Sequence, residues 1–134
     1  MSPPPSFPAF FRMRKRPNWL KKRPGRQKTR LIPVNSPASF VKSLLAQCCL
    51  GGICEWVVCP GARNMALLQV LAAAEDLVKW THFDERSAAF FALGRIQDMG
   101  LPVAVVTTSG TAAAELLPAV VEAYYQRRPL LLLT

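Results

Sequence analysis

Short apolar runs and longer stretches of helical spacing alternate along most of this chain. The short runs predict four strands, and runs such as Val103-Ala104-Val105-Val106 lack the polar alternation of a half-exposed sheet. The predicted strands cover residues 53–59, 78–81, 103–107 and 130–133. Strands of this kind suit a parallel sheet that is covered on both faces.

Between the strands, apolar residues recur at helical spacing. The predicted helices cover residues 37–50, 64–76, 87–99 and 111–126. Ser36 and Pro37 begin the first helix with a capping hydroxyl and a suitable first residue, and Gly51-Gly52 ends it. Asn64 is expected to cap the second helix, which is so apolar that both of its sides should be covered. Pro118 should kink the last helix.

Strands that alternate with helices predict an α/β fold, a three-layer αβα arrangement around a parallel sheet. The last strand, Leu130–Leu133, ends almost at the end of the chain. A row of leucines is normally followed by a loop and more sheet, and an exposed edge of this kind invites aggregation. We therefore expect a domain truncated after about four strands, a fragment of a longer protein.

The positive charge is concentrated at the N-terminus. Residues 1–30 hold ten Lys or Arg and no acid, and the remainder holds seven basic and eight acidic residues, so the net +9 divides into +10 and −1. We expect a disordered, basic, Pro-rich extension over residues 1–34 and a nearly neutral domain over 35–134. The extension is read as an upstream segment without function, a targeting leader, or an arm that binds nucleic acid or a membrane surface.

Two further features bear on the compartment. No run approaches the roughly 18 apolar residues of a membrane span, so a soluble, cytoplasmic protein is expected. The spacing of Cys48, Cys49, Cys54 and Cys59 disfavours a zinc site and favours small buried hydrophobic residues in a reducing compartment.

Three loops follow predicted strands and precede predicted helices, and such loops converge at one edge of a parallel sheet. In the loop after the second strand, Asp84 is expected to cap the next helix by accepting from the amide of Ser87 or Ala88. Glu85 can point into the crevice at the carboxyl edge of the sheet, where a ligand would bind. His82 is expected to be structural. The loops are Pro60-Gly61-Ala62-Arg63, Thr81-His82-Phe83-Asp84-Glu85-Arg86 and Ser109-Gly110-Thr111.

Arg63 offers a guanidinium to a carboxylate or phosphate, although a plain surface arginine is an equal alternative. The hydroxyls and amides of Ser109-Gly110-Thr111 suit either an anion or an ordinary capping turn. Neither a Gly-x-Gly-x-x-Gly nor a Gly-Lys-Ser/Thr motif is present. The coincidence of three such loops predicts an α/β domain that binds a ligand.

Three segments together resemble a known family. CPGARNMALL, THFDERSAAFFALG and PVAVVTTSGTAAAELLPAVVEA are similar, in order and spacing, to the N-terminal pyrimidine-binding domain of thiamine-diphosphate enzymes. The resemblance covers residues 36–134 and is closest to the synthases of menaquinone biosynthesis. Ala62 departs from the family pattern, which usually has serine there.

The resemblance implies a catalytic role for Glu85, which would hydrogen-bond N1′ of the cofactor's aminopyrimidine and promote removal of the thiazolium C2 proton. Burial against Phe83, Phe90 or the cofactor ring would have to oppose ionisation of this carboxyl at a helix start. Arg63 matches the arginine that holds a substrate carboxylate. The resemblance further places Pro60, Gly61, Ser109, Gly110 and Thr111 near the cofactor.

The implied reaction decarboxylates 2-oxoglutarate and adds the remaining fragment to isochorismate, in a homodimer or tetramer. Thiamine diphosphate and Mg²⁺ are the implied cofactors, and the diphosphate ligands belong to a C-terminal Gly-Asp-Gly…Asn motif that this chain lacks. The isolated fragment is therefore expected to be inactive. The alternatives are another 2-oxoacid enzyme, of the acetolactate-synthase or decarboxylase type, and a non-catalytic α/β module with a nucleic-acid- or membrane-binding arm.

Overall fold

A computed structural model describes residues 37–134, and the predictions for residues 1–34 and for Ser36 lie outside this range. Four strands alternate with helices, as the sequence predicts. The elements in chain order are α1 (Pro37–Leu50), β1 (Glu55–Val58), η2 (Ala62–Asn64), α2 (Met65–Ala72), β2 (Val78–Thr81), α3 (Glu85–Met99), β3 (Val103–Val106), α4 (Thr111–Glu115), α5 (Leu117–Tyr125) and β4 (Leu130–Leu133).

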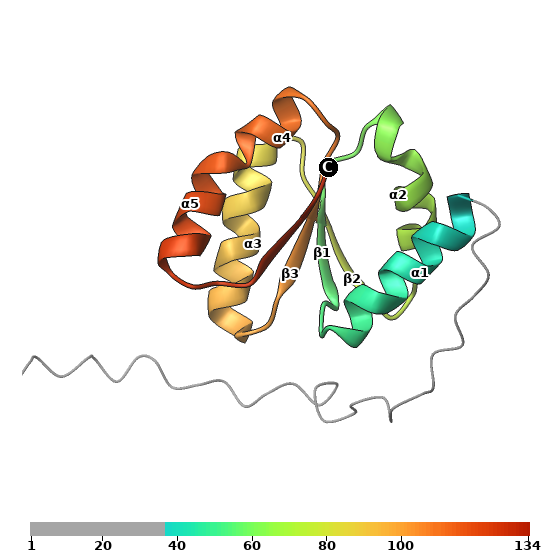
Figure 1. The fold of residues 1–134 in the computed structure, drawn as a ribbon, viewed down its shortest axis with the longest axis horizontal. Helices are drawn as coiled ribbons and strands as arrows, with labels where there is room; N and C mark the ends of the chain where they lie inside the picture. Colours follow the sequence, from blue (N-terminus) through green and yellow to red (C-terminus); the bar gives the residue numbers. More distant parts are fainter. Residues whose placement is uncertain (1–36) are drawn as a thin grey trace, which may run out of the picture.

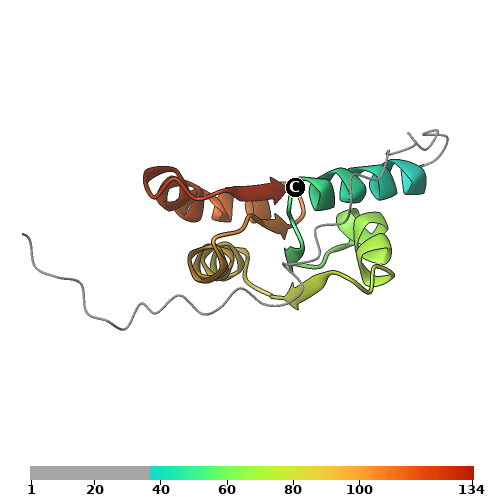
Figure 2. The ribbon, with the colours of Figure 1, turned by 90° about the horizontal axis from the view of Figure 1, so that it is seen from below.

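The four strands form one sheet in the order β2-β1-β3-β4, and every neighbouring pair is parallel. Helices α1 and α2 cover one face and α3, α4 and α5 cover the other, so the three-layer αβα prediction is confirmed (Figures 1 and 2). Residues of β1 and β3 are buried throughout. The two central strands therefore carry the core, as their continuous apolar runs indicate.

Each face of the sheet has its own apolar cluster. On the α3 side, Val57 and Val105 pack with Ile96 and with Ala119 of α5. On the other side, Trp56 packs with residues of α1 and α2. Successive strand residues point to opposite faces, so β1 contributes alternate side chains to the two clusters.

The end of α1 follows the predicted glycine stop. Gly52 has φ 90°, the left-handed conformation that glycine adopts without strain. The amide of Gly52 donates to the Cys49 carbonyl and the amide of Ile53 donates to the Cys48 carbonyl, at 3.0 Å each. These two bonds satisfy carbonyl groups at the end of the helix and turn the chain into β1.

Two helix predictions are wrong in detail. The second helix ends at Ala72 instead of residue 76, and only Leu71 of α2 is buried, so its two sides are not both covered. The predicted helix 111–126 is two helices, α4 and α5, that meet at Leu116. Pro118 lies at the start of α5, where its missing amide leaves no helical hydrogen bond unmade.

In the described part of the chain, no helix combines the length and the apolar character needed to cross a membrane. All four cysteines are free thiols. Cys48 and Cys59 are buried and Cys49 and Cys54 are half-buried, so the prediction of small buried apolar residues is confirmed for Cys48 and Cys59 only.

Candidate cofactor and substrate site

The three predicted loops begin side by side at the carboxyl edge of the sheet. Val58, the last residue of β1, is in register with Thr81 of β2 and Val106 of β3. Immediately beyond these residues, the amide of Cys59 donates to the Val106 carbonyl at 2.8 Å and the amide of His82 donates to the Val58 carbonyl at 2.9 Å. The sheet pairing therefore fixes the start of all three loops relative to one another.

The loops after β1 and β3 touch. A methyl carbon built on Gly61 would lie 2.5 Å from Cγ2 of Thr108, so only glycine allows this approach without a shift. The Nη2 of Arg63 donates to the carbonyl oxygen of Ser109 at 3.4 Å. Arg63 is otherwise exposed, which leaves most of its guanidinium available to a ligand.

A pocket of about 390 Å³ lies beside this contact, between α1, α2 and the ends of β3 and β4. Arg63 is the only charged side chain among its lining residues, and the walls from α1 and α2 are mostly apolar. The lining residues are Phe40, Val41, Leu44, Arg63, Asn64, Ala66, Leu67, Thr107, Thr108, Ser109, Leu133 and Thr134. The pocket therefore suits a small ligand with an anionic group and an apolar body.

Asn64 differs from its predicted role. Its side chain makes no capping bond to α2. Instead, Nδ2 donates to the Cys59 carbonyl at 2.9 Å and Oδ1 accepts from the Gly61 amide at 3.0 Å. The side chain is turned back onto the loop that precedes it, and sequence reasoning missed this because a polar residue before a helix is normally a cap.

Asp84 caps α3 as predicted, with Oδ1 accepting from the Ser87 amide at 2.6 Å. Hydrogen bonding from the Ser87 side chain, and then from its amide, lowers the pKa of Asp84 below its ordinary value. Glu85 is the first residue of α3 and is half-buried. Its carboxylate makes no hydrogen bond or ion pair with any side chain or backbone group of residues 37–134.

The pKa of the Cys59 thiol depends on the nearby charge of Glu85. Burial, together with the negative charges of Glu85 and Asp84, raises the pKa of Cys59 to about 11. Glu85 is therefore within electrostatic range of the end of β1. Phe83 is 94% exposed, so the expectation that its ring buries Glu85 is wrong, whereas the alternatives, Phe90 at 44% exposed and the cofactor ring, stay predictions.

Only the first residue of the loop Ser109-Gly110-Thr111 lies at the pocket, and the other two lead into α4. Ser109 lines the pocket, whereas Gly110 and Thr111 do not. Gly110 has φ 83° and turns the chain into α4, which begins at Thr111. His82 packs its ring against Phe91, with centroids 4.8 Å apart, in keeping with its expected structural role.

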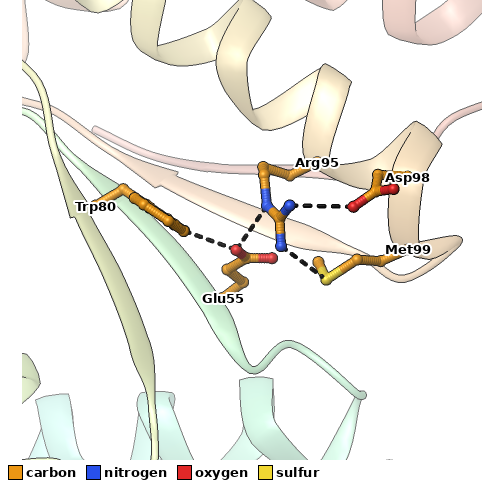
Figure 3. A network of polar contacts seen from close by, with 5 residues as sticks. All are labelled: Glu55, Trp80, Arg95, Asp98 and Met99. Carbon is orange, nitrogen blue, oxygen red and sulfur yellow. Dashed lines mark hydrogen bonds and ion pairs between the residues drawn. The ribbon is translucent and has the colours of Figure 1, made fainter. Parts of the chain in front are cut away.

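A second polar cluster, which no sequence pattern predicted, lies near the amino end of β1 (Figure 3). Glu55 is only 3% exposed, and its Oε1 accepts from Trp80 Nε1 at 2.6 Å and from Arg95 Nε at 2.8 Å. Arg95 also pairs with Asp98 at 3.1 Å. The cluster ties β1, β2 and α3 together at the edge of the sheet opposite the loops.

Comparison with known proteins gives matches of three kinds: a family model, relatives in sequence and a solved structure. Residues 41–134 match the family model described as "Thiamine pyrophosphate enzyme, N-terminal TPP binding domain". A 2-succinyl-5-enolpyruvyl-6-hydroxy-3-cyclohexene-1-carboxylate synthase from Akkermansia muciniphila is 98% identical over 101 residues, which are 75% of this chain and 19% of that protein. The synthase of the same name from Geobacillus thermodenitrificans is 52% identical over 97 residues, 72% of this chain and 16% of that protein.

Among solved structures, an X-ray structure of a protein isolated from Mycobacterium smegmatis matches with a TM-score of 0.60. It is 23% identical in sequence, and the match covers 71% of this chain and 17% of that one. At this identity the likeness shows the fold alone. In length, the chain spans 19% of the Akkermansia muciniphila synthase and 16% of the Geobacillus thermodenitrificans synthase.

Proposed function

Because the chain belongs to the family of thiamine pyrophosphate enzymes, through their N-terminal TPP binding domain, we propose that it supplies the pyrimidine-binding half of the active site of a 2-succinyl-5-enolpyruvyl-6-hydroxy-3-cyclohexene-1-carboxylate synthase. The identity of 98% to the Akkermansia muciniphila synthase supports this assignment. The whole enzyme would decarboxylate 2-oxoglutarate and join the product to isochorismate.

One structural observation carries the proposal: the carboxyl of Glu85 stands at the carboxyl edge of a parallel sheet without a partner among residues 37–134. A carboxyl in this place fits a cofactor that presents a ring nitrogen. When bound, thiamine diphosphate supplies the stabilisation of negative charge on carbon that decarboxylation requires. The part of Glu85 is to hold and move a proton at the pyrimidine, a contribution typically worth about 10² to 10⁴ in rate.

Arg63 is the second residue of the proposal. It is the only charged side chain among the residues that line the pocket, and a guanidinium matches a carboxylate in shape and charge. Both 2-oxoglutarate and isochorismate carry carboxylates, so we assign Arg63 to substrate binding. Pro60, Gly61, Ser109, Gly110 and Thr111 complete the proposed cofactor side of the site.

The proposal is tested in a full-length fusion, in which residues 41–134 replace the matching segment of the Akkermansia muciniphila synthase. Glu85→Gln should abolish exchange of the C2 proton of thiamine diphosphate while cofactor binding stays measurable. Glu75→Gln, an exposed acid outside the loops, is the matched control and should exchange normally. Normal exchange in Glu85→Gln would remove this residue from the mechanism.

The acceptor decides between related enzymes. Consumption of isochorismate together with 2-oxoglutarate supports the synthase, whereas turnover of a 2-oxoacid without isochorismate would contradict it. Mg²⁺, a homodimeric or tetrameric assembly and a cytoplasmic location also belong to the proposal, and they are suggested by the family resemblance. The isolated chain is proposed to be inactive, since the diphosphate-binding motif is not in its sequence.

A further inference from the structure

Asn64 is one of three buried polar or charged residues of the described chain, and it follows Arg63 directly. Its side chain spans the loop after β1: Nδ2 donates to the carbonyl of Cys59, and Oδ1 accepts from the amide of Gly61. The backbone amide of Asn64 also donates to the Gly61 carbonyl at 3.3 Å. One carboxamide therefore ties both sides of Pro60 to the turn that carries Arg63.

This arrangement needs an amide of this length. A carboxamide has one donor group and one acceptor group, and both are used here at 2.9 and 3.0 Å. Aspartate could accept from Gly61, but its oxygen would face the Cys59 carbonyl, and a charge would be buried. Serine could not reach both groups. A buried polar group that loses its partner destabilises the conformation that it holds.

The loop has few other attachments. Gly61 contacts Thr108 across the edge of the sheet, and the Arg63 side chain makes a single 3.4 Å bond to the Ser109 carbonyl. The guanidinium of Arg63 is therefore held only by this long hydrogen bond, whereas the backbone of Arg63 is fixed by the side-chain hydrogen bonds of Asn64. The direction in which Arg63 leaves the loop depends on the Asn64 side chain.

We propose that Asn64 is a positioning residue, whose buried carboxamide fixes loop 59–64 so that Arg63 faces the pocket and meets the anionic group of the substrate. This inference rests on the proposed function, because it assigns Arg63 to a substrate carboxylate. Misplacement of a binding group by about 1 Å can cost on the order of 10²-fold in rate. Asn64 also lines the pocket, but both groups of its carboxamide are used within the loop, so its effect on substrate use should run through Arg63.

The test uses the full-length fusion with Arg63→Ala, Asn64→Asp and Asn64→Ser. Arg63→Ala identifies which substrate depends on the guanidinium, as the one whose KM rises most. Asn64→Asp should lower kcat/KM for that same substrate by about 10- to 100-fold, with the C2 proton exchange of the cofactor unchanged. Asn64→Ser buries no charge and should give a smaller loss of the same kind, which keeps the test open if Asn64→Asp does not fold. Gln69→Glu, an amide-to-acid change at an exposed site on α2, is the matched control and should behave as wild type.

A double-mutant cycle separates positioning from general damage. If Asn64 acts through Arg63, Arg63→Ala with Asn64→Asp should lose little more than Arg63→Ala alone. Multiplication of the two separate losses, or an unchanged kcat/KM in both Asn64 variants, would overturn the inference. Hydrogen exchange of peptide 59–65 should also accelerate in Asn64→Asp. If the unsubstituted fusion does not use isochorismate, the proposed function fails, whereas the exchange result still tests the loop.

Discussion

Gly61 is the residue at which one added carbon would disturb the site most directly. Its backbone is extended, with φ −162° and ψ 165°, so any residue could adopt its conformation. The constraint is steric, because Cγ2 of Thr108 occupies the place of a Cβ at 2.5 Å. The loops after β1 and β3 depend on this contact for their separation.

We expect Gly61→Ala to destabilise the chain by about 1 to 3 kcal/mol, the usual cost of an added methyl group in a packed place. Adding Thr108→Ser removes the clashing Cγ2 and should restore most of the loss. Gly94→Ala is the control, since nothing lies within 4 Å of a Cβ at this helical position, and it should stabilise by up to about 1 kcal/mol. Urea unfolding measures all three, and equal effects at Gly61 and Gly94 would contradict the steric account.

Cys59 allows the position of Glu85 to be tested chemically. Its raised pKa, about 11, keeps the thiol protonated at neutral pH, so alkylation by iodoacetamide should be slower than at the half-buried Cys49. Glu85→Gln removes a neighbouring negative charge and should speed alkylation of Cys59, as followed by mass spectrometry. Glu75→Gln should have no effect. An unchanged rate in Glu85→Gln would place its carboxyl away from the end of β1.

The same shift has a consequence for stability. A thiol whose pKa is raised from 9.0 to about 11 in the folded chain binds its proton more tightly there than in the unfolded chain. Its contribution is therefore present below pH 9 and is lost as the pH rises from 9 to about 11. Cys59→Ala should flatten the fall of the unfolding free energy across this window, as measured by urea titration at several pH values.

The local pattern of apolar residues predicted the type and order of the secondary-structure elements. It predicted the first and last residues of the helices less well. β2 and β4 have the predicted bounds, and α3 begins two residues before its predicted start because Asp84 caps it. The break between α4 and α5 is harder to predict from the sequence. Pro118 shows only which helical hydrogen bond is missing, and it does not show where one helix ends and the next begins. Whether a chain kinks or restarts there depends on the sheet and helices that it packs against.

Distant partners explain what the sequence could not show. Glu55 and Arg95 are 40 residues apart, and only the fold brings them into contact. Asn64 was interpreted by its neighbours in sequence, whereas its bonds are decided by the path of the loop. The candidate site was predicted better, because parallel strands necessarily bring their carboxyl ends to one edge.

The Glu55 cluster should make a measurable contribution to holding the edge strand β2. Arg95→Met removes the counter-charge of a carboxyl that is 4% exposed, and we expect a loss of about 3 kcal/mol, the lower end for buried pairs because the Arg95 side chain is 29% exposed. Trp80→Phe removes one donor to Glu55 and should cost about 1 to 2 kcal/mol.

Asp98→Asn provides the comparison for these two variants. Asp98 also pairs with Arg95, but its side chain is 63% exposed, so the change should cost less than about 1 kcal/mol. Thermal or urea unfolding ranks the three variants. If Arg95→Met were no more destabilising than Asp98→Asn, the buried Arg95–Glu55 pair would not be what holds β1 against α3.

At the scale of the whole molecule, the described chain presents apolar surface that its own elements do not cover. Leu117, Val121, Tyr124 and Tyr125 are exposed on α5, and β4 is paired only with β3 among the described strands. The chain also spans only 19% of the Akkermansia muciniphila synthase. These facts agree with a domain that works as one part of a larger active site.

Cofactor binding by the chain alone tests the proposal that it supplies only part of the site. Among the described residues, no group of three or more His, Cys, Asp or Glu could hold a metal ion, and Arg63 is the one cation at the pocket. A diphosphate carries several negative charges, which one exposed guanidinium cannot bind tightly. Isothermal titration of the folded chain with thiamine diphosphate and Mg²⁺ should therefore show no saturable binding tighter than about 100 μM. The full-length fusion should bind in the same titration, and tight binding by the chain alone would mean that the diphosphate site lies within these 134 residues.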